Sequence, residues 1–291
     1  MYLGLGNFFD DKNAPNLTDF SNNGVFAENA KAVTPTDSAQ NWGSLLHGVN
    51  RNKLRLDNGD FETEIEFNNE KYPSIFKIIS NYYKDHIKMA VFASWKTIIT
   101  SLIERSINLN CYSPMINENF FVRKYLNIMH NLFQKPLYDE YTIKELMNFL
   151  TKLNQQDKEQ LKLVFVHLTD LDEVGHCFGF KTKEYFNQIL ITDKYLKLIT
   201  DKIEDVLFDY KKLIIITTDH GGIGKSHGGS SEDECNVFVS IGGNGITKDL
   251  IEKEMKNMDC AAIILKALDI ELPEHFDAKF PTELERQFNF N

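Results

Sequence analysis

The fold is decided by two apolar runs, LKLVFVHLT at residues 161–169 and LIIITT at residues 213–218. Both are continuous in apolar and β-branched residues, which is typical of strands buried on both faces of a parallel sheet. Between them, residues 182–208 place apolar side chains at three-to-four-residue spacing, the pattern of an amphipathic helix. Strand, helix and strand in this order predict a βαβ crossover, which is right-handed almost without exception. The loops that leave the two strands are therefore expected to open on one edge of the sheet.

Two further runs extend the sheet. Residues 88–93 (KMAVFA) predict a third buried strand. Residues 236–241 (NVFVSI) alternate more between apolar and polar side chains, so we expect a strand nearer an edge. Strands that alternate with helical patterns predict an α/β layered fold around a mostly parallel sheet.

The segment between the early strands is less regular. A helix is expected from Pro73, since apolar residues follow on one face and proline in the first turn loses no helical hydrogen bond. Residues 51–87 and 108–160 are more polar and rich in asparagine, without strong strand patterns. We interpret residues 50–160 as partly forming insertions or a cap on one domain that spans residues 1–291.

Composition excludes several functional classes. The 291 residues carry a formal charge of −10, and the sequence pI is about 5.3, which disfavours a nucleic-acid-binding surface. No apolar run approaches the roughly 20 residues of a membrane span. The first residues, MYLGLGNFFDDKNAPNL, lack the basic and apolar regions of a signal peptide. Four scattered cysteines without a CxxC pair argue against a disulfide scaffold and an all-cysteine zinc site. The compartment and the oligomeric state stay open.

Asp and His side chains collect in the loops after the two deciding strands. The first loop is DLDEVGHCFG and the second is DHGGIGKSHGG. Single Asp and His residues in loops are usually solvated or cap helices, but five that converge on one sheet edge favour a site. Carboxylate and imidazole groups suit zinc or a similar divalent ion. The candidate ligands are Asp172, His176, Asp219, His220 and His227. Gly175 is expected to let the first loop turn tightly, and the Gly-rich second loop to fold back on the strand end.

A second group of candidates lies near the start, in TPTDSAQNWGSLLHG at residues 34–48. The pattern predicts a helix whose N-terminus lies near Ser38. A hydroxyl there can approach a phosphate that backbone N–H groups and the positive helix end bind. The alternative is that Asp37 or Ser38 is an ordinary helix cap and that Asn41 is a surface residue.

These residues resemble the alkaline phosphatase superfamily of metal-dependent phosphoryl and sulfuryl transferases. The resemblance is carried by LDEVGH, by TTDHGG some forty residues later, and by Asp-Ser-Ala at residues 37–39. Within the superfamily, the type I phosphodiesterase/nucleotide pyrophosphatase branch is most similar, through APNL at residues 14–17, Gly24 at the end of that helix, HLTDLDEVGH and DHGGIG…HGG. The resemblance implies a three-layer α/β/α fold and spans residues 14–272, although residues 50–160 match in pattern only.

The resemblance also implies a role for each residue. Asp172, His176 and His227 would hold one divalent ion. Asp219 and His220 would hold the second, together with the alkoxide of the nucleophile Ser38. Asn41 would donate to a phosphoryl oxygen. We expect two ions, most readily zinc, and a phosphoseryl intermediate in the hydrolysis of a small nucleotide-like phosphodiester or pyrophosphate.

The sequence departs from the family in one place. The family's first strand normally ends in an Asp that completes the second metal site, and MYLGLGNFF contains no such strand. Either Asp10 or Asp11 substitutes, or the second site is impaired, or an upstream segment is missing, which is the interpretation we favour.

Two other functions stay open, and a third is disfavoured. HGGSSEDE at residues 227–234 also resembles phosphoethanolamine transferases. A non-catalytic metal-binding relic is compatible with the missing Asp. A sulfatase is disfavoured, because Ser38 lacks the C/S-x-P-x-R context from which formylglycine is made.

Overall fold

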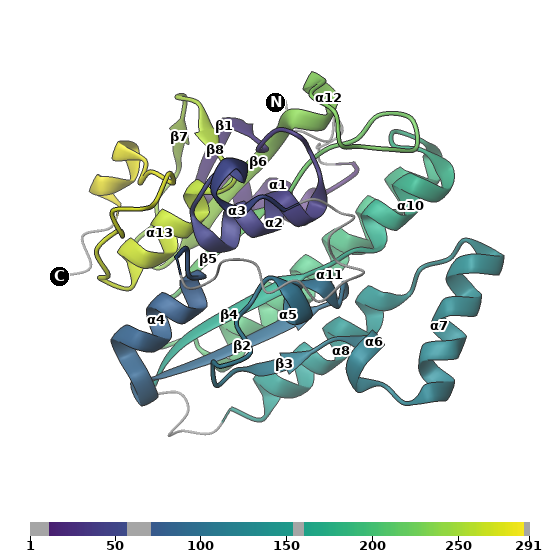
Figure 1. Ribbon diagram of the computed structural model, residues 1–291, viewed down its shortest axis with the longest axis horizontal. Coiled ribbons are helices and arrows are strands. Elements are labelled where there is room, and N and C mark those ends of the chain that lie inside the picture. The colour runs from purple at the N-terminus through teal and green to yellow at the C-terminus, as the bar shows by residue number, and fades with distance from the viewer. Residues whose placement is uncertain (1–11, 57–70, 154–159, 288–291) are drawn as a thin grey trace.

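The structure, a computed structural model, describes residues 12–56, 71–153 and 160–287. The two deciding strands are β4 (Leu161–His167) and β5 (Leu213–Thr217). Between them runs the long helix α11 (Lys183–Val206), whose N-cap Thr182 accepts a hydrogen bond from the Tyr185 backbone N–H. The predicted order of strand, helix and strand is therefore confirmed (Figure 1).

The strands form two sheets in the described ranges. One sheet has the order β3-β2-β4, and both pairings of β2 (Ile87–Ala93) are parallel. The other has the order β5-β6-β1-β7, and β8 also pairs with β1. No ladder in these ranges joins β4 to β5: β4 pairs with β2 and β5 pairs with β6, and each lies at the end of its sheet. The expectation that the crossover links two strands of one sheet is thus not met within the described residues.

The strand β6 (Asn236–Gly243) corrects a second expectation. It was expected nearer an edge, but it lies between β5 and β1 and runs antiparallel to both. Its partner β1 (Val25–Lys31) has the sequence VFAENAK, which lacks a continuous apolar run and gave no strand pattern. The other pairings, of β1 with β7 and β8 and of β2 with its neighbours, are parallel, so the sheets are mostly parallel as predicted.

Helices cover both faces of the sheets. Successive residues of one strand point into different cores. Ile215 of β5 packs against the core that contains α2, α4 and α13. The next residue, Ile216, packs against the core that contains α1, α10 and α11. In the other sheet, Phe165 of β4 contacts the first of these cores, whereas Val164 contacts a third core beneath α8 and α11. The first core is continuous across both sheets. This arrangement is the predicted α/β/α layering (Figure 1).

Residues 50–160 contribute more to the layers than expected. The helix α4 (Ile75–Tyr83) buries Phe76 and Ile79 completely in the shared core, and α8 (Tyr138–Thr151) packs on β2. The helix α7 (Phe120–Phe133) instead stands at the periphery, away from both sheets (Figure 1). Among the described residues of this segment, α7 has the peripheral position of an added unit.

The bounds of the other elements complete the fold. They are α1 (Pro15–Asn23), α2 (Ser38–His47), α3 (Arg51–Leu54), η2 (Lys84–His86), α5 (Thr97–Ser101), β3 (Asn110–Tyr112), α6 (Pro114–Asn117), α10 (Asp170–Phe178), α12 (Glu232–Cys235), β7 (Asp249–Ile251), β8 (Met255–Lys256), α13 (Asp259–Ala267) and η3 (Thr282–Arg286). The helix α1 ends at Gly24, as expected. The helix α2 ends at Gly48, where φ is 63° and a side chain would be strained. None of the helices described is both long enough and apolar enough to cross a membrane.

Candidate metal centre and nucleophile

Asp172 and His176 come from a helix, where a loop was expected. The helix α10 begins directly after β4 and places the two side chains one turn apart, with His176 Nε2 3.3 Å from Asp172 Oδ2. Gly175 therefore does not serve a tight turn. A Cβ at Gly175 would lie 2.7 Å from ring carbons of Phe180, so the missing side chain lets that ring pack against the helix.

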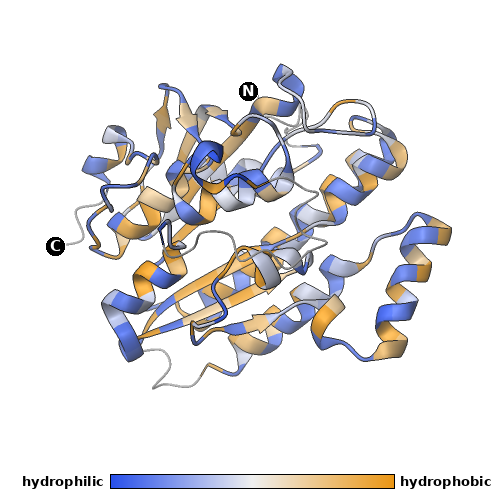
Figure 2. Ribbon diagram, in the orientation of Figure 1, coloured by the Kyte–Doolittle hydropathy of each residue, from blue (hydrophilic) through white to orange (hydrophobic). Residues whose placement is uncertain are grey.

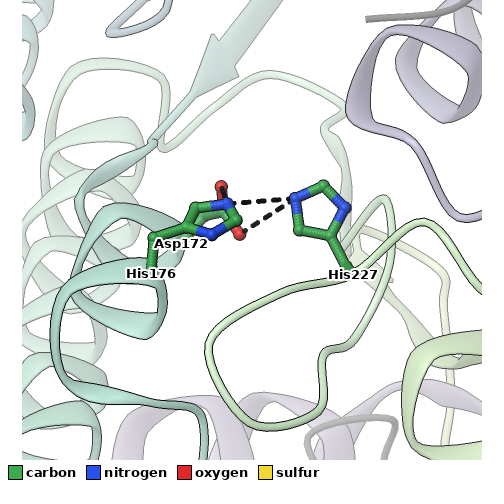
Figure 3. Close-up of side chains that lie close together, drawn as sticks. All are labelled: Asp172, His176 and His227. Carbon is green, nitrogen blue, oxygen red and sulfur yellow. Dashed lines mark hydrogen bonds and ion pairs between the residues drawn. The ribbon is translucent and has the colours of Figure 1, made fainter.

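His227 reaches the same place from the loop after β5. Ile223 and Ser226 exchange backbone hydrogen bonds, so the glycine-rich loop folds back toward the sheet as expected. His227 Nε2 lies 3.1 Å from His176 Nε2 and 3.8 Å from Asp172 Oδ1 (Figure 3). One ligand atom from each residue falls within 4.8 Å of the other two, which is the spacing of a three-residue metal site.

Backbone carbonyls fix the tautomers of the imidazole rings. A carbonyl oxygen only accepts hydrogen bonds, so each Nδ1 beside one must carry a hydrogen. The other ring nitrogen, Nε2, is then the atom that can bind a metal ion. Metal-binding histidines commonly have this outer contact. The pairs are His176 Nδ1 with Lys225 O at 2.9 Å, His227 Nδ1 with Thr36 O at 2.9 Å, and His220 Nδ1 with Gly221 O at 2.8 Å.

The electrostatics of the group favour a cation. Burial raises the pKa of Asp172, but its hydrogen bond with His176 and the charges of nearby histidines outweigh burial, so the pKa lies below its usual value. The same hydrogen bond raises the pKa of His176 to about 9. Asp172 Oδ1 is buried and accepts no hydrogen bond from the described part of the chain. A buried carboxylate that has one orphaned oxygen and lies beside two imidazole Nε2 atoms fits a divalent ion.

Ser38, Asp219 and His220 form a second group beside the first. Ser38 is the first residue of α2, as the sequence indicated, and its Oγ lies 2.9 Å from His220 Nε2. Asp219 Oδ2 lies 3.1 Å from the same nitrogen. Burial lowers the pKa of His220, but the charge and hydrogen bond of Asp219, the charge of Asp172 and the Gly221 carbonyl together outweigh burial and bring the pKa to about 9. The ring of His220 stacks on that of His227 with 3.7 Å between centroids, so the two groups are in contact.

The position of Asn41 differs from the expected one. Asn41 is completely buried, and its Nδ2 donates to the carbonyls of Val33, Pro35 and Asp37. Both amide hydrogens are thus engaged, and none is left for a phosphoryl oxygen. Asn41 is therefore not a surface residue, and its amide group holds the loop that presents Ser38.

Two supporting residues have no local sequence pattern. The buried Asn257 donates through Nδ2 to Asp219 O at 3.1 Å and to Asn41 Oδ1 at 3.2 Å, so it ties both halves of the Ser38 group together. Asp139, on α8, accepts the backbone N–H groups of Thr169 and Asp170 and thereby caps the helix that carries Asp172 and His176. In the same way, Asp170 accepts hydrogen bonds from the backbone N–H groups of Tyr138 and Asp139.

Asp10 and Asp11, the proposed substitutes for the missing ligand, lie outside the described residues.

Solved structures with the same fold include several phosphoester and sulfate ester hydrolases. The murine ectonucleotide pyrophosphatase/phosphodiesterase 5 superposes with a TM-score of 0.66 at 12% identity, covering 92% of each chain. A phosphonate monoester hydrolase from Silicibacter pomeroyi gives a TM-score of 0.65 at 12% identity over 94% of this chain and 72% of that one. At such identities the similarity establishes the fold alone, which is the alkaline phosphatase-like fold that the sequence predicted.

Curated relatives match a shorter stretch. The GPI ethanolamine phosphate transferase 1 of Emericella nidulans is 32% identical over 108 residues, 36% of this chain and 12% of the relative. The enzyme of the same name from Saccharomyces cerevisiae is 26% identical over 97 residues, 33% of this chain and 11% of the relative. The matched stretch is thus about a tenth of each relative's length. The model of the type I phosphodiesterase/nucleotide pyrophosphatase family, in contrast, matches residues 5–228, which include every candidate ligand and Ser38. The chain therefore belongs to the type I phosphodiesterase/nucleotide pyrophosphatase family.

Proposed function

We propose that this protein is a metal-dependent hydrolase of phosphodiester or pyrophosphate bonds in which Ser38 is the nucleophile. The observation that carries the proposal is the 2.9 Å contact between Ser38 Oγ and His220 Nε2, beside the cluster of Asp172, His176 and His227. A serine at a helix N-terminus whose hydroxyl faces a set of imidazole and carboxylate groups has the surroundings that such a nucleophile needs.

The donor types favour zinc. Asp172, His176 and His227 would hold one ion, and Asp219, His220 and Ser38 would hold a second. When bound, such ions lower the pKa of a hydroxyl ligand and stabilise charge on the entering and leaving oxygens. Mixed imidazole and carboxylate donors suit zinc better than magnesium or calcium, which prefer oxygen ligands alone.

The residues of the chain account for the chemical steps as follows. Ser38 Oγ attacks phosphorus while the bond to the leaving oxygen breaks, which gives a phosphoseryl intermediate. The N-terminus of α2 faces the transferred phosphoryl group and favours its negative charge. Water then attacks the phosphorus of this intermediate, releases the phosphate monoester that keeps the second substituent of the substrate, and restores the serine hydroxyl. Asn41 and Asn257 act indirectly, by fixing the loops on which Ser38 and Asp219 stand.

A second candidate function is phosphoethanolamine transfer. Its support is the name shared by the curated relatives, GPI ethanolamine phosphate transferase 1. The first half of the reaction would be the same, and an alcohol would replace water as the acceptor from the phosphoseryl group. A metal-binding relic without turnover is the third alternative, because the ligand expected from Asp10 or Asp11 is unassigned.

The test uses bis-p-nitrophenyl phosphate with zinc. Ser38→Ala should reduce turnover to background while the melting temperature changes little, since a terminal hydroxyl contributes at most about 2 kcal/mol. Ser74→Ala is the matched control, because Ser74 also lies at a helix N-terminus, that of α4, outside the proposed site. Undiminished turnover in Ser38→Ala would contradict the assignment. Transfer to an added alcohol in place of water, detected by mass spectrometry, would favour the second function.

A further inference from the structure

Exposed apolar side chains are concentrated on the peripheral helix α7 and on α6, which precedes it. Half of the large apolar side chains found exposed in the described residues lie in α6 and α7. They are Ile116, Phe120, Phe121, Tyr125, Ile128, Leu132 and Phe133. A patch of this kind on a protein surface marks an interaction site.

Four of these side chains form a continuous stripe along α7. Phe121, Tyr125, Ile128 and Leu132 follow one another at spacings of four, three and four residues, so they share one face of the helix. Phe121 is 80% exposed and Leu132 is 74% exposed, whereas Leu126, on another face, is fully buried. Figure 2 shows the alternation of hydrophobic and hydrophilic residues along this helix.

The stripe points outward because the opposite face of α7 is anchored. His130 Nε2 lies 3.2 Å from Glu173 Oε2 of α10, and His130 Nδ1 lies 3.1 Å from the Tyr138 hydroxyl of α8. With Leu126 buried as well, these contacts fix the rotation of the helix about its axis. The apolar face is therefore held toward solvent as part of the fold.

The helix that carries the stripe has a positive formal charge on an acidic protein. No Asp or Glu occurs from Asn119 to Tyr138, although the whole chain carries −10. Lys124 and Lys135 are exposed in this stretch. A hollow of about 560 Å³ beside the stripe is lined by apolar and basic side chains together, among them Met115, Phe120, Leu132, Arg123 and Lys124. A symmetric pair of such helices would bring like charges together, which disfavours a second copy of the chain as the partner.

We propose that α7 docks this protein on the surface of a membrane that contains anionic phospholipids. Aromatic and aliphatic side chains that enter the interface, with basic side chains near the headgroups, are the features of helices that lie in the plane of a membrane. Lys124 and Lys135 would meet phosphate or carboxylate groups of the lipids, and the stripe would reach the start of the acyl chains. The inference stands independently of the proposed catalysis, because it uses none of the same residues.

The test is co-sedimentation of the full chain, with zinc, on vesicles of phosphatidylcholine with or without phosphatidylserine. The chain should bind the vesicles that contain phosphatidylserine more tightly, and salt should weaken the binding. Phe121→Ser combined with Leu132→Ser should lower the partition coefficient at least about tenfold, since two large apolar side chains no longer enter the interface. Lys124→Glu should lower it by a smaller factor.

The matched control is Leu198→Ser combined with Phe208→Ser. These side chains are 51% and 65% exposed on another part of the surface, and their loss should leave vesicle binding unchanged. Unchanged melting temperatures would show that all variants are folded. Equal binding of the α7 variant and the unmodified chain, or no binding of the unmodified chain, would overturn the proposal. A dimer in light scattering that the α7 variant lacks would also overturn it, because a second copy would then cover the stripe.

Discussion

Asp139 is expected to control metal affinity without touching the metal. Its carboxylate accepts the Thr169 N–H at 2.8 Å and the Asp170 N–H at 3.2 Å, at the start of the helix that carries Asp172 and His176. The N-cap residue Thr169 makes no side-chain cap of its own. Asp139→Ala would therefore leave the first turn of α10 uncapped and free to shift.

The size of the effect follows from two opposing contributions. Two hydrogen bonds to a carboxylate contribute about 3–6 kcal/mol together. Burial opposes them because it disfavours the ionised form, and the pKa of Asp139 is raised to about 6 even with these bonds in place. The net loss of stability in Asp139→Ala should therefore be about 1–3 kcal/mol. Zinc affinity should fall about tenfold or more, as it does when an outer partner of a metal ligand is removed.

The assay is a zinc titration against a chelating dye at a temperature where all variants are folded. Asp193→Ala is the matched control, because Asp193 is also buried and accepts backbone N–H groups at a helix start, those of Asn16 and Leu17 in α1. That helix carries no candidate ligand. The control should lose comparable stability and keep its zinc affinity. Equal zinc affinity in Asp139→Ala and the unmodified chain, or an equal loss in Asp193→Ala, would refute the reasoning.

Two further predictions concern the same centre. Zinc affinity should rise with pH toward about 9, because zinc and a proton compete for His176 Nε2 and the pKa of His176 is about 9; the dye titration repeated across pH checks this, and an affinity that is flat between pH 6 and 9 would contradict it. Gly175→Ala should destabilise the protein by about 1–3 kcal/mol in urea unfolding, since the added Cβ would lie 2.7 Å from the Phe180 ring. Cys177→Ala on the same helix adds no atom and should cost less, and a stable Gly175→Ala variant would show that Phe180 can move.

The sequence predicted the parts of the fold that have a local pattern. β4, β5, β2 and α11 are recognisable because apolar runs and helical periodicity follow from burial on two faces or on one. β1 escaped notice because pairing with β6 and β8, not its own composition, makes VFAENAK a strand. The position of β6 was wrong for a similar reason, since alternation indicates which faces of a strand are buried but not which strands lie beside it.

The site could be predicted where residue type carries the chemistry. The resemblance and the loop positions identified Asp172, His176, His227 and the Ser38 group, and the structure brings these residues together. Asn41, Asn257 and Asp139 could not be assigned, because each acts through hydrogen bonds to backbone atoms that only the folded chain places. The helix α10 was not predicted, because the glycine in LDEVGH was taken to indicate a tight turn in a loop. In the structure Gly175 lies within the helix, and its lack of a side chain leaves room for the Phe180 ring.

The two groups of the centre should bind zinc with unequal strength. Asp172, His176 and His227 supply three ligands, and α10 and backbone carbonyls hold them in place. Asp219 and His220 supply two, and Ser38 adds a hydroxyl, which is a weak ligand until it loses its proton. A titration should therefore show a tight phase that His176→Ala removes and a weak phase that Asp219→Asn removes. Two equally tight phases would mean that another carboxylate completes the Ser38 group. Asp10→Asn and Asp11→Asn would then show which of the two supplies it, because the substitution of that residue should weaken one phase and leave the other unchanged.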